Sequence, residues 1–363
     1  MTPTNDNLLE TLSSENKKEF FSRVSKATQK IKAQKFCCYP NCNTGASVID
    51  AHLLKKQGTL SPISDNGSVY WTRISQEEVL KSNGKPRPFL CPISKVSTFK
   101  GFCSEHDNQI FELIDQNDFV LDPQHLFLYM YRVISSGIWW SVARLAREAA
   151  MAGGEKKLAR RRAKNINFVA NQLELMQIEV HRGVMYKKKL DLIKENNEFS
   201  RIRGVSFEII GDVGYAASVD VAPTCDWNGN PMSISMINHP AIPSVSITVH
   251  PNQSGKGGQV SFSWLDTTEE YIHPFVHSFC ALSPKSKGKK LMQYFFHNYG
   301  STAISPKFWD SLNVESQNFL LRTWWGQHEG YQRTDREAIL DTEPEIETFE
   351  LKDPLWLDNH SLS

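Results

Sequence analysis

The spacing of apolar residues changes along this chain. From about residue 123 to 197 they recur at helical intervals, beginning with Leu126 and Leu128, and this spacing predicts helices. A Met-Ala-Gly-Gly interruption at residues 151–154 predicts that one helix ends there and another begins. From about residue 203 the period becomes two, which is typical of strands with alternating faces.

The alternating positions fall into four segments separated by turn residues. These are Phe207/Ile209, Met232/Ile234/Met236, Val245/Ile247/Val249 and Val260/Phe262/Trp264. Small or polar residues lie between them, so the pattern predicts an antiparallel sheet with one buried face. Helical spacing returns after Glu269, and Ser305-Pro306 fits an N-cap followed by proline in the first helical position. Residues 15–35 predict a further amphipathic helix near the N-terminus.

Composition narrows the class of protein. The 363 residues contain no run of about 18 apolar side chains, and the first residues are polar, so we expect neither a membrane span nor secretion. Seven cysteines, unevenly spread, do not form a disulfide framework in a chain of this length. A reducing, cytoplasmic location is therefore the expectation.

Charge is segregated, although Lys+Arg 41 and Asp+Glu 40 nearly cancel. Residues 151–203 hold 13 basic and 6 acidic side chains, a net charge of +7, and residues 330–363 hold 3 basic and 9 acidic ones, a net of −6. The densest basic run is Lys156, Lys157, Arg160, Arg161, Arg162 and Lys164. This run is either a solvated helix face or a surface that contacts phosphates. The acidic segment is either a soluble end or a cover for the basic face.

The most specific chemistry lies in the first third of the chain. Cys37-Cys38-Tyr39-Pro40-Asn41-Cys42 is a cysteine knuckle, and Cys103-x2-His106 follows about sixty residues later. Two ligands from a turn and two from the start of a helix can surround a structural zinc ion. We predict Cys38, Cys42, Cys103 and His106 as ligands, although the spacing also permits Cys37 in place of Cys38. The alternative is that these cysteines are small buried side chains.

Between the two ligand pairs, a short apolar strand delivers His52, with Asp50 two residues earlier on the same face. This arrangement resembles the treble-clef finger of HNH endonucleases. The resemblance implies that His52 is a general base, that Asp50 matches the residue preceding it, and that Asp107 binds a catalytic Mg²⁺ or Mn²⁺. Thr98 departs from the pattern, because it stands where the family has an asparagine that orients the histidine.

A second resemblance covers roughly residues 35–135. The run Ala51-His52-Leu53-Leu54-Lys55-Lys56, the segment Ser97-Thr98-Phe99-Lys100-Gly101-Phe102-Cys103-Ser104-Glu105-His106-Asp107, and the pair Tyr131-Arg132 look like a family of bacterial zinc-finger-like proteins. That family implies a bacterial, cytoplasmic setting but supplies no biochemical activity. A role in antiphage defence is a hypothesis only.

Each of these residues also has a simpler interpretation. His52 is alternatively a zinc ligand or a histidine bonded to backbone, and Asp107 is alternatively a carboxylate that accepts the N–H of a zinc-bound ring or caps a helix. Lys55 and Lys56 either reach phosphates beside the finger or are ordinary surface residues. The sequence contains no P-loop, dinucleotide-binding or nucleophile-elbow motif.

The sequence thus predicts an α+β protein with three parts. Residues 1–118 form a treble-clef zinc domain, residues 119–203 a basic helical segment, and residues 204–363 an antiparallel β-rich domain with capping helices and an acidic tail. The leading hypothesis is a nucleic-acid-binding protein with an HNH-like, metal-dependent nuclease finger. The alternative is a non-catalytic scaffold, stabilised by zinc, that binds a protein partner or small ligand through its β-rich half.

Overall fold

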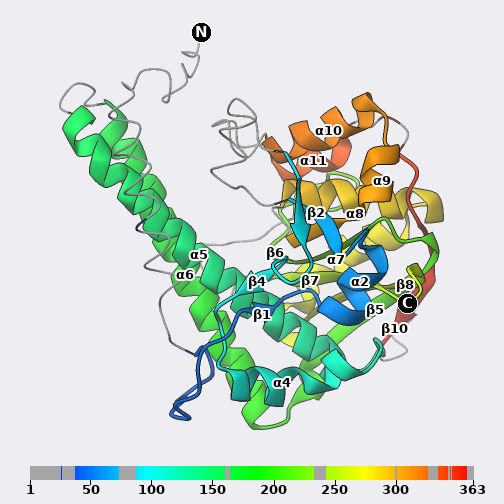
Figure 1. The fold of residues 1–363 in the computed structure, drawn as a ribbon, viewed down its shortest axis with the longest axis horizontal. Helices are drawn as coiled ribbons and strands as arrows, with labels where there is room; N and C mark the ends of the chain where they lie inside the picture. The colour runs from blue at the N-terminus through cyan, green and yellow to red at the C-terminus, as the bar shows by residue number, and fades with distance from the viewer. Residues whose placement is uncertain are drawn as a thin grey trace.

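A computed structural model of the chain describes residue 26 and residues 37–72, 87–159, 164–232, 243–298, 301–325, 334–341, 344 and 346–357 (Figure 1). Several predictions therefore lie outside the described residues. These are the N-terminal helix apart from residue 26, the strand expected at Ile234 and Met236, and the side chains of Arg160, Arg161 and Arg162.

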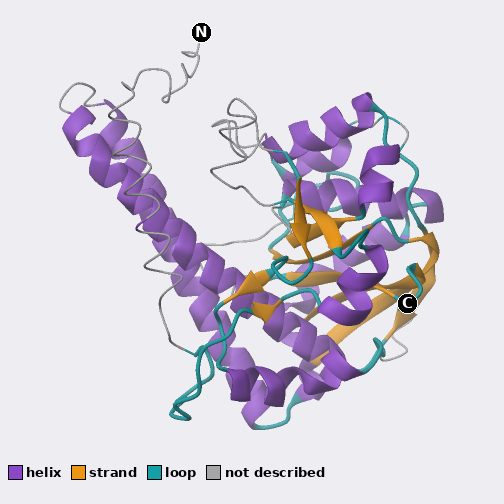
Figure 2. Ribbon diagram, viewed as in Figure 1, coloured by secondary structure: helices purple, strands orange, loops and turns teal. Residues whose placement is uncertain are grey.

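Strands and helices are both abundant, as the sequence predicts. Ten named strands in the described residues form an eight-stranded sheet, in the order β10-β5-β8-β7-β6-β9-β2-β3, and a separate pair, β1 and β4 (Figure 2). The bounds are β1 (Ala51–His52), β2 (Ser68–Trp71), β3 (Phe89–Pro92), β4 (Thr98–Phe99), β5 (Ile202–Asp212), β6 (Tyr215–Val221), β7 (Val245–Pro251), β8 (Lys256–Leu265), β9 (Ser301–Ile304) and β10 (Glu350–Trp356). Every pairing between these strands is antiparallel.

Helices cover the sheet on both faces. The described helices are α2 (Ser61–Ile63), α4 (Ser104–Gln116), α5 (Pro123–Ala159), α6 (Lys164–Glu195), α7 (Glu269–Cys280), α8 (Pro284–His297), α9 (Pro306–Ser311), α10 (Val314–Trp325) and α11 (Asp335–Leu340), with short turns η1 (Lys56–Leu60), η2 (Phe199–Arg201) and η3 (Asp266–Thr268). Ser305 precedes α9 and Pro306 begins it, which confirms the predicted helix start. None of the described helices is long and apolar enough to cross a membrane.

The prediction that only one face of the sheet is buried is wrong. The apolar face, with Phe207 and Phe262, packs against Phe279 of α7. The opposite face, with its small and hydroxylated residues, lies beneath α5, and Ser206 and Ser261 are both buried there. Small side chains on that face allow a helix to approach closely, so alternation here reflects two different partners and not core against solvent.

The helix break expected at residues 151–154 is also wrong. α5 continues through both glycines to Ala159, and α6 begins at Lys164. A glycine inside a helix costs about 1 kcal/mol relative to alanine, which the surrounding helix-favouring residues can offset. The two helices lie side by side, and the end of α5 and the start of α6 project from the body as a long arm (Figure 1).

Residues 1–118, predicted to form the finger, and the β-rich segment 204–363 contribute strands to one sheet. β2 and β3 lie within residues 1–118, yet Tyr70 and Trp71 of β2 pair with Ile304 and Ala303 of β9. The acidic C-terminal segment is also part of the fold, because β10 pairs with β5 at the other edge. The described part of that segment is therefore not a free tail.

Candidate metal centre

Four side chains converge beside the β1–β4 pair. The ligand atoms of Cys37, Cys42, Cys103 and His106 all lie within 4.8 Å of one another. Cys103 Sγ lies 3.2 Å from His106 Nδ1, and Cys37 Sγ lies 3.5 Å from the same nitrogen. Three thiols and one imidazole form a donor set that zinc prefers in four-coordinate structural sites. The cluster is therefore consistent with a zinc site of the Cys3His type.

Local chain geometry brings the two ligand pairs together. Asn41, at the tip of the knuckle, has φ of 53°, a left-handed conformation that asparagine tolerates, and it turns the chain so that Cys42 faces back. Cys103 immediately precedes α4, and His106 lies in the first turn of that helix. The N–H of Cys38 donates to the Gly101 carbonyl at 2.6 Å, which fastens the knuckle to the strand leading into α4.

The ligand set differs from the prediction at one position: Cys37, not Cys38, joins the cluster. The Sγ of Cys37 also accepts the backbone N–H of Cys103 at 3.3 Å. Cys38 instead lies near Lys187 and Asp191 of α6, whose charges act on its thiol. The two adjacent cysteine side chains therefore have different neighbours, and only that of Cys37 faces the cluster.

The pKa values of two cysteines in the cluster are shifted in opposite directions. Burial raises the pKa of Cys37 to about 12. Burial also acts to raise the pKa of Cys103, but hydrogen bonds from the His106 backbone and from Thr44 outweigh it, and the pKa lies below its ordinary value. Metal binds thiolates, so loading this site must release protons.

Aromatic contacts shield the cluster on one side. The Tyr39 ring stacks on His106 with centroids 3.9 Å apart, and the Nζ of Lys194 lies 5.0 Å from the centre of the Tyr39 ring. Phe102, next to Cys103, packs edge-on against Phe111 of α4 at 5.3 Å. The cluster thus connects the knuckle, α4 and α6.

His52 lies on β1, directly opposite Thr98 of β4, and is half-buried. Burial lowers its pKa, and the charges of Lys56 and Arg132 act in the same direction, while a hydrogen bond to the Val96 carbonyl opposes them. Its Nδ1 is buried and has no hydrogen-bond partner among the described residues. A neutral imidazole of this kind can accept a proton at neutral pH.

Asp107 follows the ligand His106 in the first turn of α4. Burial raises the pKa of its carboxyl group, and the charge of Arg132 partly offsets this effect. Its Oδ1 is buried, and the described part of the chain offers it no hydrogen-bond partner. His52 and Asp107 therefore both lie within electrostatic range of Arg132.

Arg132, on α5, is the charged residue at this site to which sequence reasoning gave no role. Its guanidinium group makes two hydrogen bonds to Asp115, of 2.8 and 2.6 Å, and lies 4.1 Å from the centre of the Phe111 ring. Arg132 is buried, and its Nε has no hydrogen-bond partner in the described residues. The Tyr131-Arg132 pair in the second resemblance was the available signal.

The remaining predicted site residues are more dispersed. Asp50 is exposed and lies 4.0 Å from the Lys100 ammonium group, so it does not join the His52 site directly. The Nζ of Lys55 donates to the Asn117 carbonyl at 3.2 Å, whereas Lys56 is exposed. Lys164 is the first residue of α6, and its side chain is outside the described set.

No protein-family model matches this sequence, and comparison with curated proteins and with solved structures gives no match either. The functional argument therefore depends on the geometry of the site.

Proposed function

We propose that this protein binds nucleic acid and cleaves it with an HNH-like, treble-clef finger. One observation carries the proposal: His52 and Asp107, on two different elements beside the metal cluster, each keep a buried atom without a partner among the described residues. Buried polar atoms are nearly always paired, so two unpaired atoms close to a metal cluster are consistent with side chains that bind an external ligand. A nucleophilic water is a ligand of suitable chemistry for the histidine nitrogen, and a divalent cation is one for the carboxylate oxygen.

Each side chain has a definite role in this proposal. Neutral His52 accepts a proton from the attacking water, because its lowered pKa keeps the ring uncharged. Asp107 offers a carboxylate oxygen to Mg²⁺ or Mn²⁺, which when bound stabilises the negative charge that develops on the phosphate. Exposed Lys56 supplies positive charge near His52 that attracts the polyanion, whereas the charge of buried Arg132 is offset by Asp115.

The arm extends the surface that nucleic acid can contact. α5 and α6 contain most of the segment 151–203 with its net charge of +7, and they project from the body that holds the finger (Figure 1). Phosphate contacts made by lysine and arginine release counterions, so binding should weaken steeply as salt concentration rises. Binding that is insensitive to salt would contradict this part of the proposal.

The first test measures cleavage of plasmid DNA, single-stranded DNA and RNA by zinc-loaded protein with added Mg²⁺ or Mn²⁺. We expect His52→Ala to lower the rate by about 10²–10⁴-fold while one zinc ion per chain remains bound. His273→Ala, at an exposed histidine of α7 outside the finger and the arm, is the matched control and should retain activity.

The pH profile adds a second readout. Activity requires neutral His52, whose pKa lies below its ordinary value, so the rate should fall only at pH values below those at which an ordinary histidine gains a proton. A rate that is already lost near pH 6.5 would remove His52 from the role of base.

The scaffold hypothesis has one specific observation in its favour. The hydroxyl group of Thr98 donates to the Lys95 carbonyl at 3.2 Å, so it does not orient His52 as the asparagine of HNH enzymes does. If wild type and His52→Ala are equally inactive on every substrate while zinc stays bound, the finger is structural. The β-rich half would then be the functional region.

A further inference from the structure

The β-rich half carries a pair of histidines outside the finger. His273 and His277 are four residues apart on α7, and their ring centroids are 4.0 Å apart with an angle of 42° between the rings. Residues four apart lie on the same side of a helix. His273 is exposed and His277 is half-buried, so both rings can be reached from solvent.

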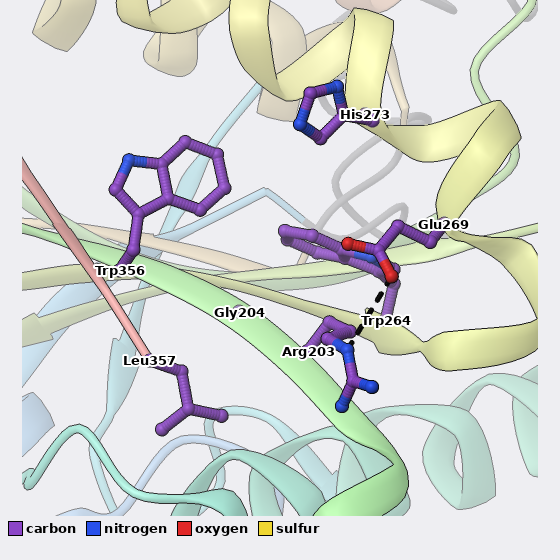
Figure 3. A pocket seen from close by; sticks show the side chains of 7 residues that line it. All are labelled: Arg203, Gly204, Trp264, Glu269, His273, Trp356 and Leu357. Atoms are coloured by element: carbon purple, nitrogen blue, oxygen red, sulfur yellow. Dashed lines mark ion pairs between the residues drawn. The ribbon is translucent and has the colours of Figure 1, made fainter. Parts of the chain in front are cut away.

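An aromatic wall faces the two histidines. The Trp356 ring of β10 lies 6.2 Å from His273 and 5.9 Å from His277. Beside it is a small pocket of about 20 Å³, open to solvent, that His273, Trp264 and Trp356 line together (Figure 3).

The charges around the pair are balanced. Arg203 and Glu269 face each other in the same pocket, with Nε and Oε2 3.5 Å apart (Figure 3). The guanidinium charge, which would otherwise repel a cation, is thus offset. Burial and the neighbouring His273 lower the pKa of His277, which favours its neutral, metal-binding form.

We propose that His273 and His277 together bind one divalent transition-metal ion, of the class of Zn²⁺, Ni²⁺ or Cu²⁺. Imidazole nitrogen suits these ions, and zinc–nitrogen bonds are about 2.0–2.1 Å long. Two rings with centroids 4.0 Å apart can direct one nitrogen each at a common ion after small side-chain rotations. Two protein ligands leave further coordination positions for water or for a donor atom of a molecule in the pocket.

Ni²⁺ is the probe for the test, because bound nickel can be measured separately from the zinc that is loaded into the cluster first. Full-length protein without a polyhistidine tag is first loaded with zinc and then titrated with Ni²⁺, and bound nickel is measured by equilibrium dialysis. We expect one Ni²⁺ per chain in addition to the zinc. We also expect tryptophan fluorescence to be quenched, because the ion would lie close to Trp356.

Variants assign the binding to this pair. His273→Asn and His277→Asn should each weaken Ni²⁺ binding by at least about tenfold, since loss of even an indirect partner of a metal ligand costs that much. His181→Asn, at an exposed histidine of α6, should bind as the wild type does. Trp356→Phe should reduce the fluorescence quenching but leave the amount of bound Ni²⁺, measured by equilibrium dialysis, unchanged.

Two results would overturn the proposal. One is the absence of Ni²⁺ uptake by the wild type beyond the zinc site. The other is uptake that persists in the double variant His273→Asn/His277→Asn, with zinc content and circular dichroism showing that the protein is folded. Exposed His273→Asn provides the decisive comparison if the half-buried His277→Asn fails to fold.

Discussion

Cys103 in the finger and Phe262 in the sheet are both fully buried, but their surroundings differ in kind. Around Phe262 the neighbours are apolar rings, with Phe279 at 4.9 Å and Phe207 at 5.8 Å. Around Cys103 the neighbours are polar, with the His106 imidazole at 3.2 Å, the Thr44 hydroxyl group at 3.6 Å and the Cys42 thiol at 4.0 Å. Apolar contacts stabilise a region by themselves, whereas clustered thiolates repel one another until a cation joins them. Equal burial therefore conceals two different sources of stability.

The largest effect should follow loss of the metal. Cys103→Ser removes a ligand, so we expect zinc to be lost and the finger to lose its structure, because structural zinc contributes about 10–16 kcal/mol of apparent folding free energy. Zinc content and hydrogen exchange measure this change. Amides of α4 should lose protection, while those of β7 and β8 should keep most of theirs.

The same experiment tests the ligand assignment. Cys37→Ser should lose zinc as Cys103→Ser does, whereas Cys38→Ser should retain it, because the Cys38 thiol is outside the cluster. If Cys37→Ser retains zinc and Cys38→Ser loses it, then Cys38 and not Cys37 is the ligand.

Truncating a side chain in the sheet core should lower the free energy of unfolding but leave zinc binding intact. Phe262→Ala leaves a cavity between Phe207 and Phe279, and such changes cost about 3–5 kcal/mol. Urea denaturation measures the loss. The protein that remains folded should still bind one zinc ion per chain. Loss of zinc from the folded variant would mean that the two regions are not energetically distinct.

Within the sheet, Asp220 should make the free energy of unfolding depend on pH. Burial raises the pKa of Asp220 to about 6, although hydrogen bonds from Ser244 and Ser246 oppose the shift. The unfolded chain loses this proton near pH 3.9 and the folded chain near pH 6. The free energy of unfolding should therefore fall as pH rises across that interval, by at most about 3 kcal/mol. Thermal unfolding of Asp220→Asn should lack this dependence, and an identical pH profile in both proteins would contradict it.

The smallest expected effect concerns the contact between finger and arm. Lys194→Gln removes the positive charge over Tyr39, and such cation–π contacts contribute about 0.5–1 kcal/mol at exposed sites. The affinity for zinc, measured by competition with a chelator, should change by only a few fold. A larger loss would show that α6 is part of the metal site.

The features that could be predicted from the sequence are those that depend on residues close together in the chain. Cys42, Cys103 and His106 could be found because a knuckle and a helix start impose fixed spacings. The central strands β7 and β8 agree with the alternating positions because apolar residues there face one helix layer. The choice between Cys37 and Cys38 was not predictable, since it depends on the direction in which the knuckle meets Gly101.

Pairing between distant segments was not predictable in this way. β10 lies in an acidic stretch and contains Pro354, which argues for a loop, yet it pairs with β5 at the sheet edge, where proline is tolerated. The pairing of β2 with β9 joins residues more than two hundred positions apart. Only the packed sheet determines such neighbours, because no local pattern encodes them.

The chain leaves the metal cluster at Cys42 and returns to it at Cys103, and between these points β2 and β3 complete one end of the large sheet. A gene fragment that ended at residue 118 would encode both ligand pairs together with two strands deprived of β9. Their exposed edge would invite pairing between molecules. Residues 1–118 are therefore not expected to fold as an independent domain when transferred to another protein. The metal cluster and the large sheet should be inherited together.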